Sequence, residues 1–147
     1  MNKKEIILKI LNEMGYCPTV DEDNDIVFNY QLKTIYFSII NDDEPDQNMV
    51  LGNFYSFEES EAVQMLIVCN KINREIRHIK VAVNPDLKAV SAFYQFVLTD
   101  EESARANIKV AFDLFGTLRS YFAQEVDRLS ENSESDSDNK PEDEANE

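Results

Sequence analysis

The sequence predicts an α+β fold in which a five-stranded, mostly antiparallel sheet packs against helices. Two observations lead to this prediction. Apolar residues recur at helical spacing in three segments, and they alternate with other residues in five further segments. These segments follow one another as α-β-β-β-α-β-β-α, and short polar links join successive strands, which favours antiparallel neighbours. A chain of 147 residues is long enough for one such domain.

The first part of the chain predicts one helix followed by three strands. The helix carries a single apolar stripe, which consists of Ile6, Ile7, Ile10, Leu11 and Met14. Asn2 is placed to cap the start of this helix, and Gly15 is placed to end it. Alternating residues then predict strands over residues 26–30, 35–39 and 49–55, with polar turns between them.

The second part predicts a helix, two strands and a long helix. Ser56 and Glu59 fit the S-x-x-E capping box, as do Thr99 and Glu102, so we expect a helix to begin at each place. The two strands between these helices cover residues 79–83 and 89–98. The first of these helices runs directly into its strand, without a glycine or a proline between them.

Charge and composition divide the chain into a domain and a tail. Residues 1–129 hold 21 acidic and 13 basic residues, a net charge of -8, and they contain all the apolar stripes. Residues 130–147 hold eight acidic residues and one lysine, a net charge of -7. This second segment has no aromatic or large aliphatic residue, so it cannot bury enough surface to offset the cost of ordering. We therefore expect a single domain over residues 1–129 and a disordered acidic tail over residues 130–147.

The formal charge of -15 bears on the choice of partners. A negative field repels phosphate groups, so we expect no nucleic acid or membrane partner. The first residues are charged and amphipathic and lack a cleavage site, unlike a signal peptide, and no apolar run reaches membrane length. Cys17 and Cys69 match no metal or redox spacing. We therefore expect a cytoplasmic protein.

The sequence contains no motif for catalysis or for cofactor binding. It has none of the glycine-rich phosphate loops, nucleophile elbows or zinc-protease helices. The acidic segment 21–25 lacks the glycine and the terminal glutamate of a calcium loop, so it is interpreted as a solvated turn. The only histidine, His78, stands at a helix end beside Arg77. We expect no catalytic residue, no metal and no cofactor, and therefore no enzyme.

The strand over residues 89–98 carries apolar side chains on both of its faces. If the helices cover one face of the sheet, the other face keeps aromatic residues, unless a second helical layer covers that face too. An uncovered apolar surface usually marks an interface or a groove. The candidate interface residues are Tyr36, Tyr55, Met65, Ile72, Tyr94 and Phe96. Because one helical layer cannot bury all the apolar residues, we expect a homodimer.

The order of elements resembles the type III secretion chaperone-like fold, and the sequence resembles the YbjN-like family. Four segments carry the resemblance: ILKILNEMGY, DEDNDIVFNY, VCNKINREIRHIKVAV and AFDLFGTLRSYF. It spans about residues 3–129, within the error of such boundaries. It implies a non-enzymatic α+β domain with no catalytic residues to carry over. Secretion chaperones of this fold are acidic cytoplasmic dimers that bind client segments, and YbjN-like proteins are described as sensory or regulatory.

Three functions remain open at this point. We expect a cytoplasmic protein-binding module, chaperone-like or regulatory, whose partner is a protein client or regulator. The alternative is a sensory domain that binds a small molecule in an apolar pocket. A small enzyme that uses carboxylates ranks last, because acidic residues are so abundant that no single pair is informative.

Overall fold

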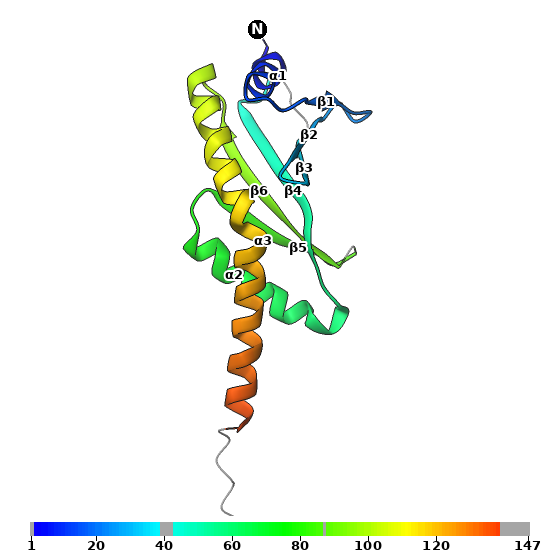
Figure 1. Ribbon diagram of the computed structural model, residues 1–147, viewed down its shortest axis with the longest axis vertical. Helices are drawn as coiled ribbons and strands as arrows, with labels where there is room; N and C mark the ends of the chain where they lie inside the picture. Colours follow the sequence, from blue (N-terminus) through cyan, green and yellow to red (C-terminus); the bar gives the residue numbers. More distant parts are fainter. Residues whose placement is uncertain (1, 39–42, 87, 139–147) are drawn as a thin grey trace, which may run out of the picture.

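The computed structural model describes residues 2–38, 43–86 and 88–138. The elements are α1 (Lys3–Glu13), β1 (Thr19–Val20), β2 (Ile26–Tyr30), β3 (Lys33–Phe37), β4 (Asp46–Ser56), a 3-10 turn η1 (Glu59–Glu61), α2 (Ala62–Glu75), β5 (Ile79–Asn84), β6 (Ala89–Val97) and α3 (Glu101–Asp138). Figure 1 shows α3 running along the whole sheet and continuing past its lower end.

The predicted α+β class is confirmed, with six strands instead of five. The strand order is β1-β2-β3-β4-β6-β5, and every neighbouring pair is antiparallel. The additional strand, β1, is only two residues long and pairs with the start of β2. The sequence did not predict it because two residues that follow Pro18 are too few to show an alternation.

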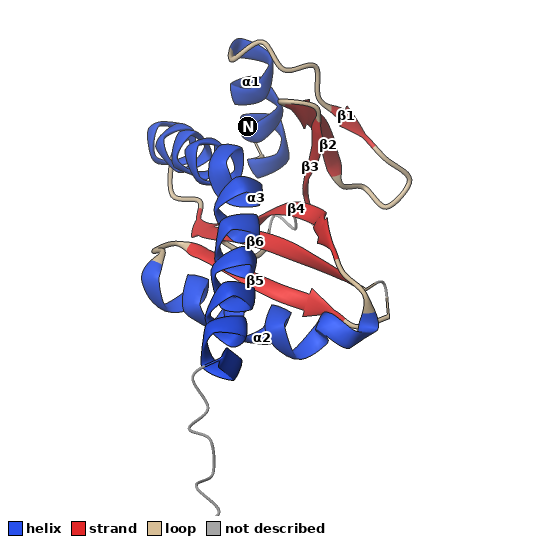
Figure 2. Cartoon of the chain, turned by 60° about the horizontal axis from the view of Figure 1, so that its bottom comes forward, coloured by secondary structure: helices blue, strands red, loops and turns tan. Residues whose placement is uncertain are grey.

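The three helices build one core with one face of the sheet (Figure 2). The strands β2 to β6 contribute alternate residues to that core, as in β6, where Val90, Ala92, Tyr94 and Phe96 are buried. Among the helices, α3 supplies the most side chains to the core, and its Phe115 is fully buried. The helices therefore leave the opposite face of the sheet uncovered by any described helix.

Two of the predicted helix starts differ from the observed ones. Ser56 does not cap α2, because it is still the last residue of β4 and pairs with Ala89. The chain first makes the turn η1, where the Glu61 carboxylate accepts the backbone N–H of Glu58 at 3.0 Å. In α3 the cap is Asp100, whose carboxylate accepts the N–H of Ser103 at 2.7 Å. At Ser56, strand pairing thus takes precedence over a local capping motif.

The predicted cap of α1 is confirmed. The Asn2 side chain accepts the backbone N–H of Glu5 at 2.8 Å, and the Glu5 carboxylate accepts the backbone N–H of Asn2 at 3.1 Å. Asn2 belongs to no strand among the described residues, so strand pairing does not compete with this cap. The local capping motif therefore determines where α1 begins.

The predicted boundary at residue 129 is not the end of a helix. α3 continues to Asp138, nine residues into the segment expected to be disordered. The remaining part of the predicted tail, residues 139–147, lies outside the described residues. None of the described helices combines the length and the apolar character needed to cross a membrane.

Neither outer edge of the sheet presents a long, free strand to which another strand could add. At one edge, β1 offers only two residues. At the other edge, the Asn73 side chain of α2 accepts the N–H of Val81 at 2.8 Å and donates to its C=O at 3.0 Å. One amide thus takes the place of a neighbouring strand at the middle of β5. Both edges are therefore poor templates for a further strand.

Candidate binding groove between β4 and α3

The candidate site is the place where β3 and β4 separate. Their pairing includes Phe37 with Met49, Tyr36 with Val50 and Ile35 with Leu51, and it stops there. β4 continues to Ser56, and over this last stretch the described structure pairs it with β6 alone. The side of residues 52–56 that faces away from β6 is therefore an open strand edge within the sheet.

An irregularity in β4 shapes this edge. The register with β6 shifts between Leu51 and Tyr55, and Asn53 has a positive φ of 48°. The backbone N–H of Asn53 turns to the Ser91 hydroxyl, which accepts it at 2.9 Å. β-Bulges of this kind bend a strand and re-aim its side chains. The bend carries β4 away from the β2–β3 hairpin and opens a space above α3.

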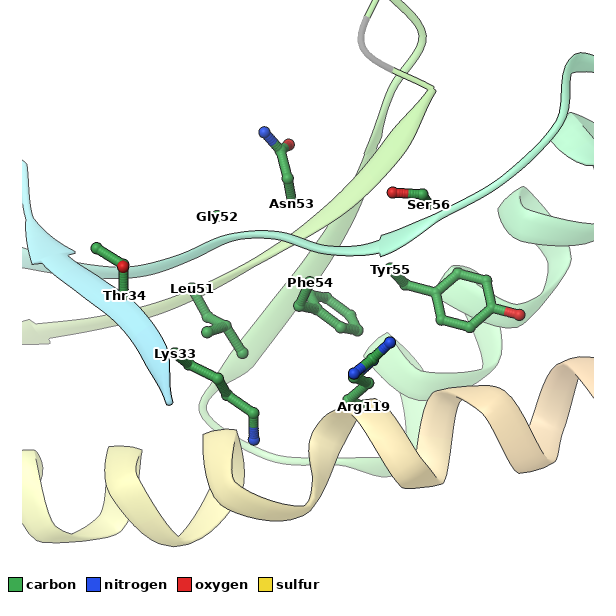
Figure 3. Close-up of a pocket in the computed structure, with 9 residues that line it drawn as sticks. All are labelled: Lys33, Thr34, Leu51, Gly52, Asn53, Phe54, Tyr55, Ser56 and Arg119. Carbon is green, nitrogen blue, oxygen red and sulfur yellow. The ribbon is translucent and has the colours of Figure 1, made fainter. Parts of the chain in front are cut away.

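That space is a groove of about 610 Å³ (Figure 3). Its walls come from the start of β3, the second half of β4 and one turn of α3. The lining residues are Lys33, Thr34, Leu51, Gly52, Asn53, Phe54, Tyr55, Ser56 and Arg119. Figure 3 shows Lys33 and Arg119 on the same side of β4, both directed into the gap between that strand and α3.

Lys33 reaches the groove because of a tight turn. It begins β3 directly after Gln31 and Leu32, both of which have positive φ angles, 49° and 64°. The Lys33 ammonium donates to the carbonyls of Phe115 and Gly116 at 3.4 and 3.5 Å. Contacts with carbonyl oxygens fix the position of the ammonium and leave its charge uncompensated.

Gly116 allows the hairpin to approach α3 closely. A Cβ at this position would lie 3.3 Å from the side-chain oxygen of Gln31 and 3.5 Å from the Tyr30 hydroxyl. The glycine in the middle of the helix, which costs helix propensity, therefore accommodates the tip of the β2–β3 hairpin. That packing places Lys33 beside the helix turn that carries Arg119.

Neither groove cation is neutralised within the part of the chain that the structure describes. The ion pairs there involve Lys9, Lys71, Arg105 and Arg128 and leave out Lys33 and Arg119. Both side chains present positive charge to the groove, and the carboxylates of Glu61 and Asp127 lie near its Tyr55 end.

Tyr55 forms the aromatic end of the groove. Its ring packs against Phe122 with centroids 4.8 Å apart. Burial raises the pKa of its hydroxyl, and the nearby carboxylates of Glu61 and Asp127 raise it further, while Arg119 lowers it. Tyr55 is therefore a neutral hydrogen-bond donor at physiological pH, beside the positive charge of Arg119.

Four of the six predicted interface residues lie in the core. Met65 and Ile72 have no exposed surface, and Tyr94 and Phe96 are buried against the helices. The Tyr94 hydroxyl donates to the Asn107 side chain at 2.8 Å, which satisfies it inside the protein. The helical layer thus covers that face of β6, and these four residues offer no surface to a partner.

Tyr36 and Tyr55 are the two predicted residues that remain partly exposed. Tyr55 lines the groove, whereas Tyr36 lies on the uncovered face of the sheet, where it borders a separate hollow of about 420 Å³. Thr34, Gly52 and Asn53 line both spaces. The two tyrosines therefore flank the same stretch of β4 from opposite faces.

Sequence reasoning did not identify Lys33 or Arg119. Lys33 is an ordinary lysine after a turn, and Arg119 lies on the exposed side of α3, away from its apolar stripe. A separation of 86 positions gives no local indication that the two meet. Only the tertiary arrangement, in which the hairpin tip packs on α3, brings them together.

The other motifs considered in the sequence have structural roles. The Asp21 carboxylate accepts the N–H groups of Asp23 and Asp25, both at 2.9 Å, and so closes its own turn. His78 links α2 to β5 with a positive φ of 69°. Cys69 is buried, and burial raises the pKa of its thiol to about 11. No group of three potential metal ligands occurs among the described residues.

Comparison with known protein families places the chain in a family. The YbjN family model, described as "Putative bacterial sensory transduction regulator", matches residues 3–128. The matched region includes both groove cations and the open edge of β4. No curated protein matches the chain.

Proposed function

Since the chain belongs to the YbjN family, whose members are described as regulators of sensory transduction, we propose that it is a cytoplasmic, non-enzymatic regulatory module that binds an extended segment of a partner protein. The binding site is the groove between β4 and α3. The observation that carries the proposal is the open strand edge of residues 52–56 beside two uncompensated cations. A chaperone-like function, in which the segment belongs to a client, is one form of this activity.

The strand edge supplies the main-chain part of recognition. Extended peptides add to exposed sheet edges because their N–H and C=O groups complete the ladder. In this sheet the two outer edges are short or covered, which makes the interior edge of β4 the best template among the described strands. The walls next to it are Phe54 and Tyr55, which suit apolar side chains of the segment.

The two cations supply selectivity. Lys33 and Arg119 favour a segment with an Asp or Glu side chain or a C-terminal carboxylate, since charge-assisted hydrogen bonds to guanidinium are strong and directional. The rest of the protein is acidic, so it favours basic residues on either side of that carboxylate. The expected partner segment therefore carries one acidic residue among basic and apolar ones.

Binding of a segment in this groove involves no chemical step and no cofactor. The groove offers hydrogen bonds, positive charge and aromatic surface, all of which can hold a segment without transforming it. The Lys33 ammonium donates to two carbonyls of α3, and these contacts hold its positive charge in place.

A small-molecule sensor is the second candidate, and the same two cations favour it. A groove of about 610 Å³ also has the size of a small-ligand site. A small anion would use Lys33 and Arg119 but would leave the backbone edge of β4 unused. The two functions therefore differ in whether main-chain hydrogen bonds contribute to binding.

Peptide selection tests the proposal. Heptapeptides are selected on the immobilised protein from a random display library, and the affinity of the best synthetic peptide is measured by fluorescence anisotropy. We expect an acidic residue in the selected sequences and a loss of affinity of at least about tenfold in the double variant Lys33→Gln/Arg119→Gln. The control double variant Arg77→Gln/Lys88→Gln removes two exposed cations outside the groove and should bind normally.

A second measurement separates the two candidates. N-methylation of alternate residues in the selected peptide removes main-chain donors and should abolish binding if the peptide extends the sheet. Peptide binding that is insensitive to N-methylation would contradict strand addition. Stabilisation by small anions such as citrate, dependent on Lys33 and Arg119 and without any peptide binding, would instead support the sensor.

A further inference from the structure

α2 carries a row of large apolar side chains on its outer surface. Val63 is 67% exposed, Leu66 57% and Ile67 50%. They have helical spacing and lie opposite the buried side of the helix, which packs on the core through Met65, Val68, Cys69 and Ile72. Three neighbouring exposed residues of this kind form a patch that is unfavourable in water.

The patch lies between charges of opposite sign. Glu59, in the turn before α2, and Arg74, in its last turn, are both exposed. Glu59 is seven residues before Leu66, and Arg74 is seven residues after Ile67. The outer surface of η1 and α2 is thus acidic at one end, apolar in the middle and basic at the other end. The two charges are symmetric in spacing about the point between Leu66 and Ile67.

We propose that this surface binds a second copy of the chain, with the two α2 helices antiparallel about a twofold axis between Leu66 and Ile67. In that register Leu66 faces the partner's Ile67, and Glu59 faces the partner's Arg74. A twofold interface repeats every contact, so both charge pairs form. An unrelated partner would not need this correspondence, whereas an antiparallel copy of the same helix fits it at each end.

A hollow next to the patch provides room for the partner. It has a volume of about 230 Å³ and lies between α2 and α3, where Ile67, Val68 and Leu129 contribute apolar walls. In the proposed register the partner's Leu66 approaches Ile67, at the edge of this hollow. A leucine that enters it would be removed from water on most of its surface.

The net charge of -15 on each copy opposes association. The paired charges at Glu59 and Arg74 offset part of this repulsion at the interface itself, and salt screens the charges that lie farther away. The interface involves α2 and leaves the β4 groove free, so it does not depend on the proposed function.

Sedimentation equilibrium of the full chain at micromolar concentration and physiological salt tests the interface. We expect a dimer for the natural sequence and a monomer for Leu66→Glu. The control Val110→Glu changes an exposed apolar residue of α3, which is 39% exposed, and should remain a dimer. Circular dichroism melts check that the variants are folded. A natural protein that is monomeric, or a Leu66→Glu variant that is still dimeric, would overturn the proposal.

A charge exchange tests the register. Glu59→Arg and Arg74→Glu each place like charges at both symmetric positions, so each should weaken the dimer by about tenfold or more. The double variant Glu59→Arg/Arg74→Glu restores opposite charges and should recover most of the lost affinity. Both positions are exposed, so the monomer should tolerate either change. A double variant no tighter than the single ones would exclude the antiparallel pairing.

Discussion

Phe115 and Leu66 both lie in the middle of helical apolar stripes, but their surroundings are opposite. Phe115 is fully buried between α3 and the sheet, whereas Leu66 is 57% exposed on α2. Helical spacing of apolar residues predicts burial at both positions, and Leu66 is exposed instead. α2 has apolar residues on nearly all sides, so periodicity alone could not decide which of them face the core.

Replacement by alanine should separate the two residues. We expect Phe115→Ala to lower the free energy of unfolding by about 3–5 kcal/mol, because it leaves a large cavity. Leu66→Ala should change it by less than about 1 kcal/mol in the monomer, since little buried surface is lost. Urea denaturation at a concentration where each variant is monomeric measures both. A small effect at Phe115 would mean that α3 does not pack as described.

Glu125 is a buried carboxylate between α2 and α3. Lys71 donates to it, and Arg128 donates to its other oxygen at 3.0 Å. The hydrogen bond from Lys71 holds the pKa of Glu125 below its usual range, although burial alone would raise it. The same contact raises the pKa of Lys71. The folded state therefore favours the ionised carboxylate more strongly than the unfolded chain does.

The pH dependence of stability follows from that shift. A depressed folded pKa stabilises the protein above the unfolded value of about 4.3, and the contribution is lost as the pH falls through the folded pKa. We expect Glu125→Gln to be less stable than the natural protein at neutral pH and the difference to shrink in acid. Urea denaturation across the acid range measures it. The control Asp127→Asn removes an exposed carboxylate two residues farther along α3 and should change the stability at neutral pH much less.

At the scale of elements, the sequence predicts the helices and the longer strands well. Alternation and helical spacing located α1, β2, β3, β4, α2, β5, β6 and α3 in the correct order, because each has one face in the core. The capping residues of two helices were wrong, since the strand pairing of Ser56 and the position of Asp100 depend on the tertiary fold. The groove was not predicted, because it depends on where β3 leaves β4.

The covered edge of β5 depends on one side chain. Asn73 makes both hydrogen bonds to Val81, so Asn73→Ala leaves a donor and an acceptor of the strand without their partner. We expect a loss of about 1–3 kcal/mol in unfolding free energy and greater aggregation, since an exposed edge templates pairing between chains. Chemical denaturation and light scattering measure these effects.

A matched change on the same helix provides the control. Asn70→Ala alters an exposed asparagine that faces solvent near the dimer patch and contacts no strand edge in the described hydrogen bonds. It should leave both unfolding and scattering nearly unchanged in the monomer. Equal effects at positions 70 and 73 would show that the edge is not what Asn73 protects.

At the scale of the whole molecule, the C-terminal segment carries nearly half of the net charge. Residues 130–147 contribute -7 of the total -15. We expect a chain that ends at Leu129 to melt within about 2–4 °C of the full chain, because the removed segment has no large apolar residue to add to the core. Differential scanning calorimetry measures the change. A larger loss would show that the end of α3 supports the fold.

The short junction between β3 and β4 also affects how the native protein opens. Among the described residues, three pairs and the hydrogen bond from the Ser38 N–H to the Asn48 carbonyl join these strands, whereas β4 and β6 share eight pairs. The β1–β3 unit is thus attached to the rest of the sheet by far fewer main-chain hydrogen bonds than hold β4, β5 and β6 together. Partial opening of a protein follows such weak boundaries. Amide protons in β2 and β3 should therefore exchange with solvent as one group, before those of β4 and β6.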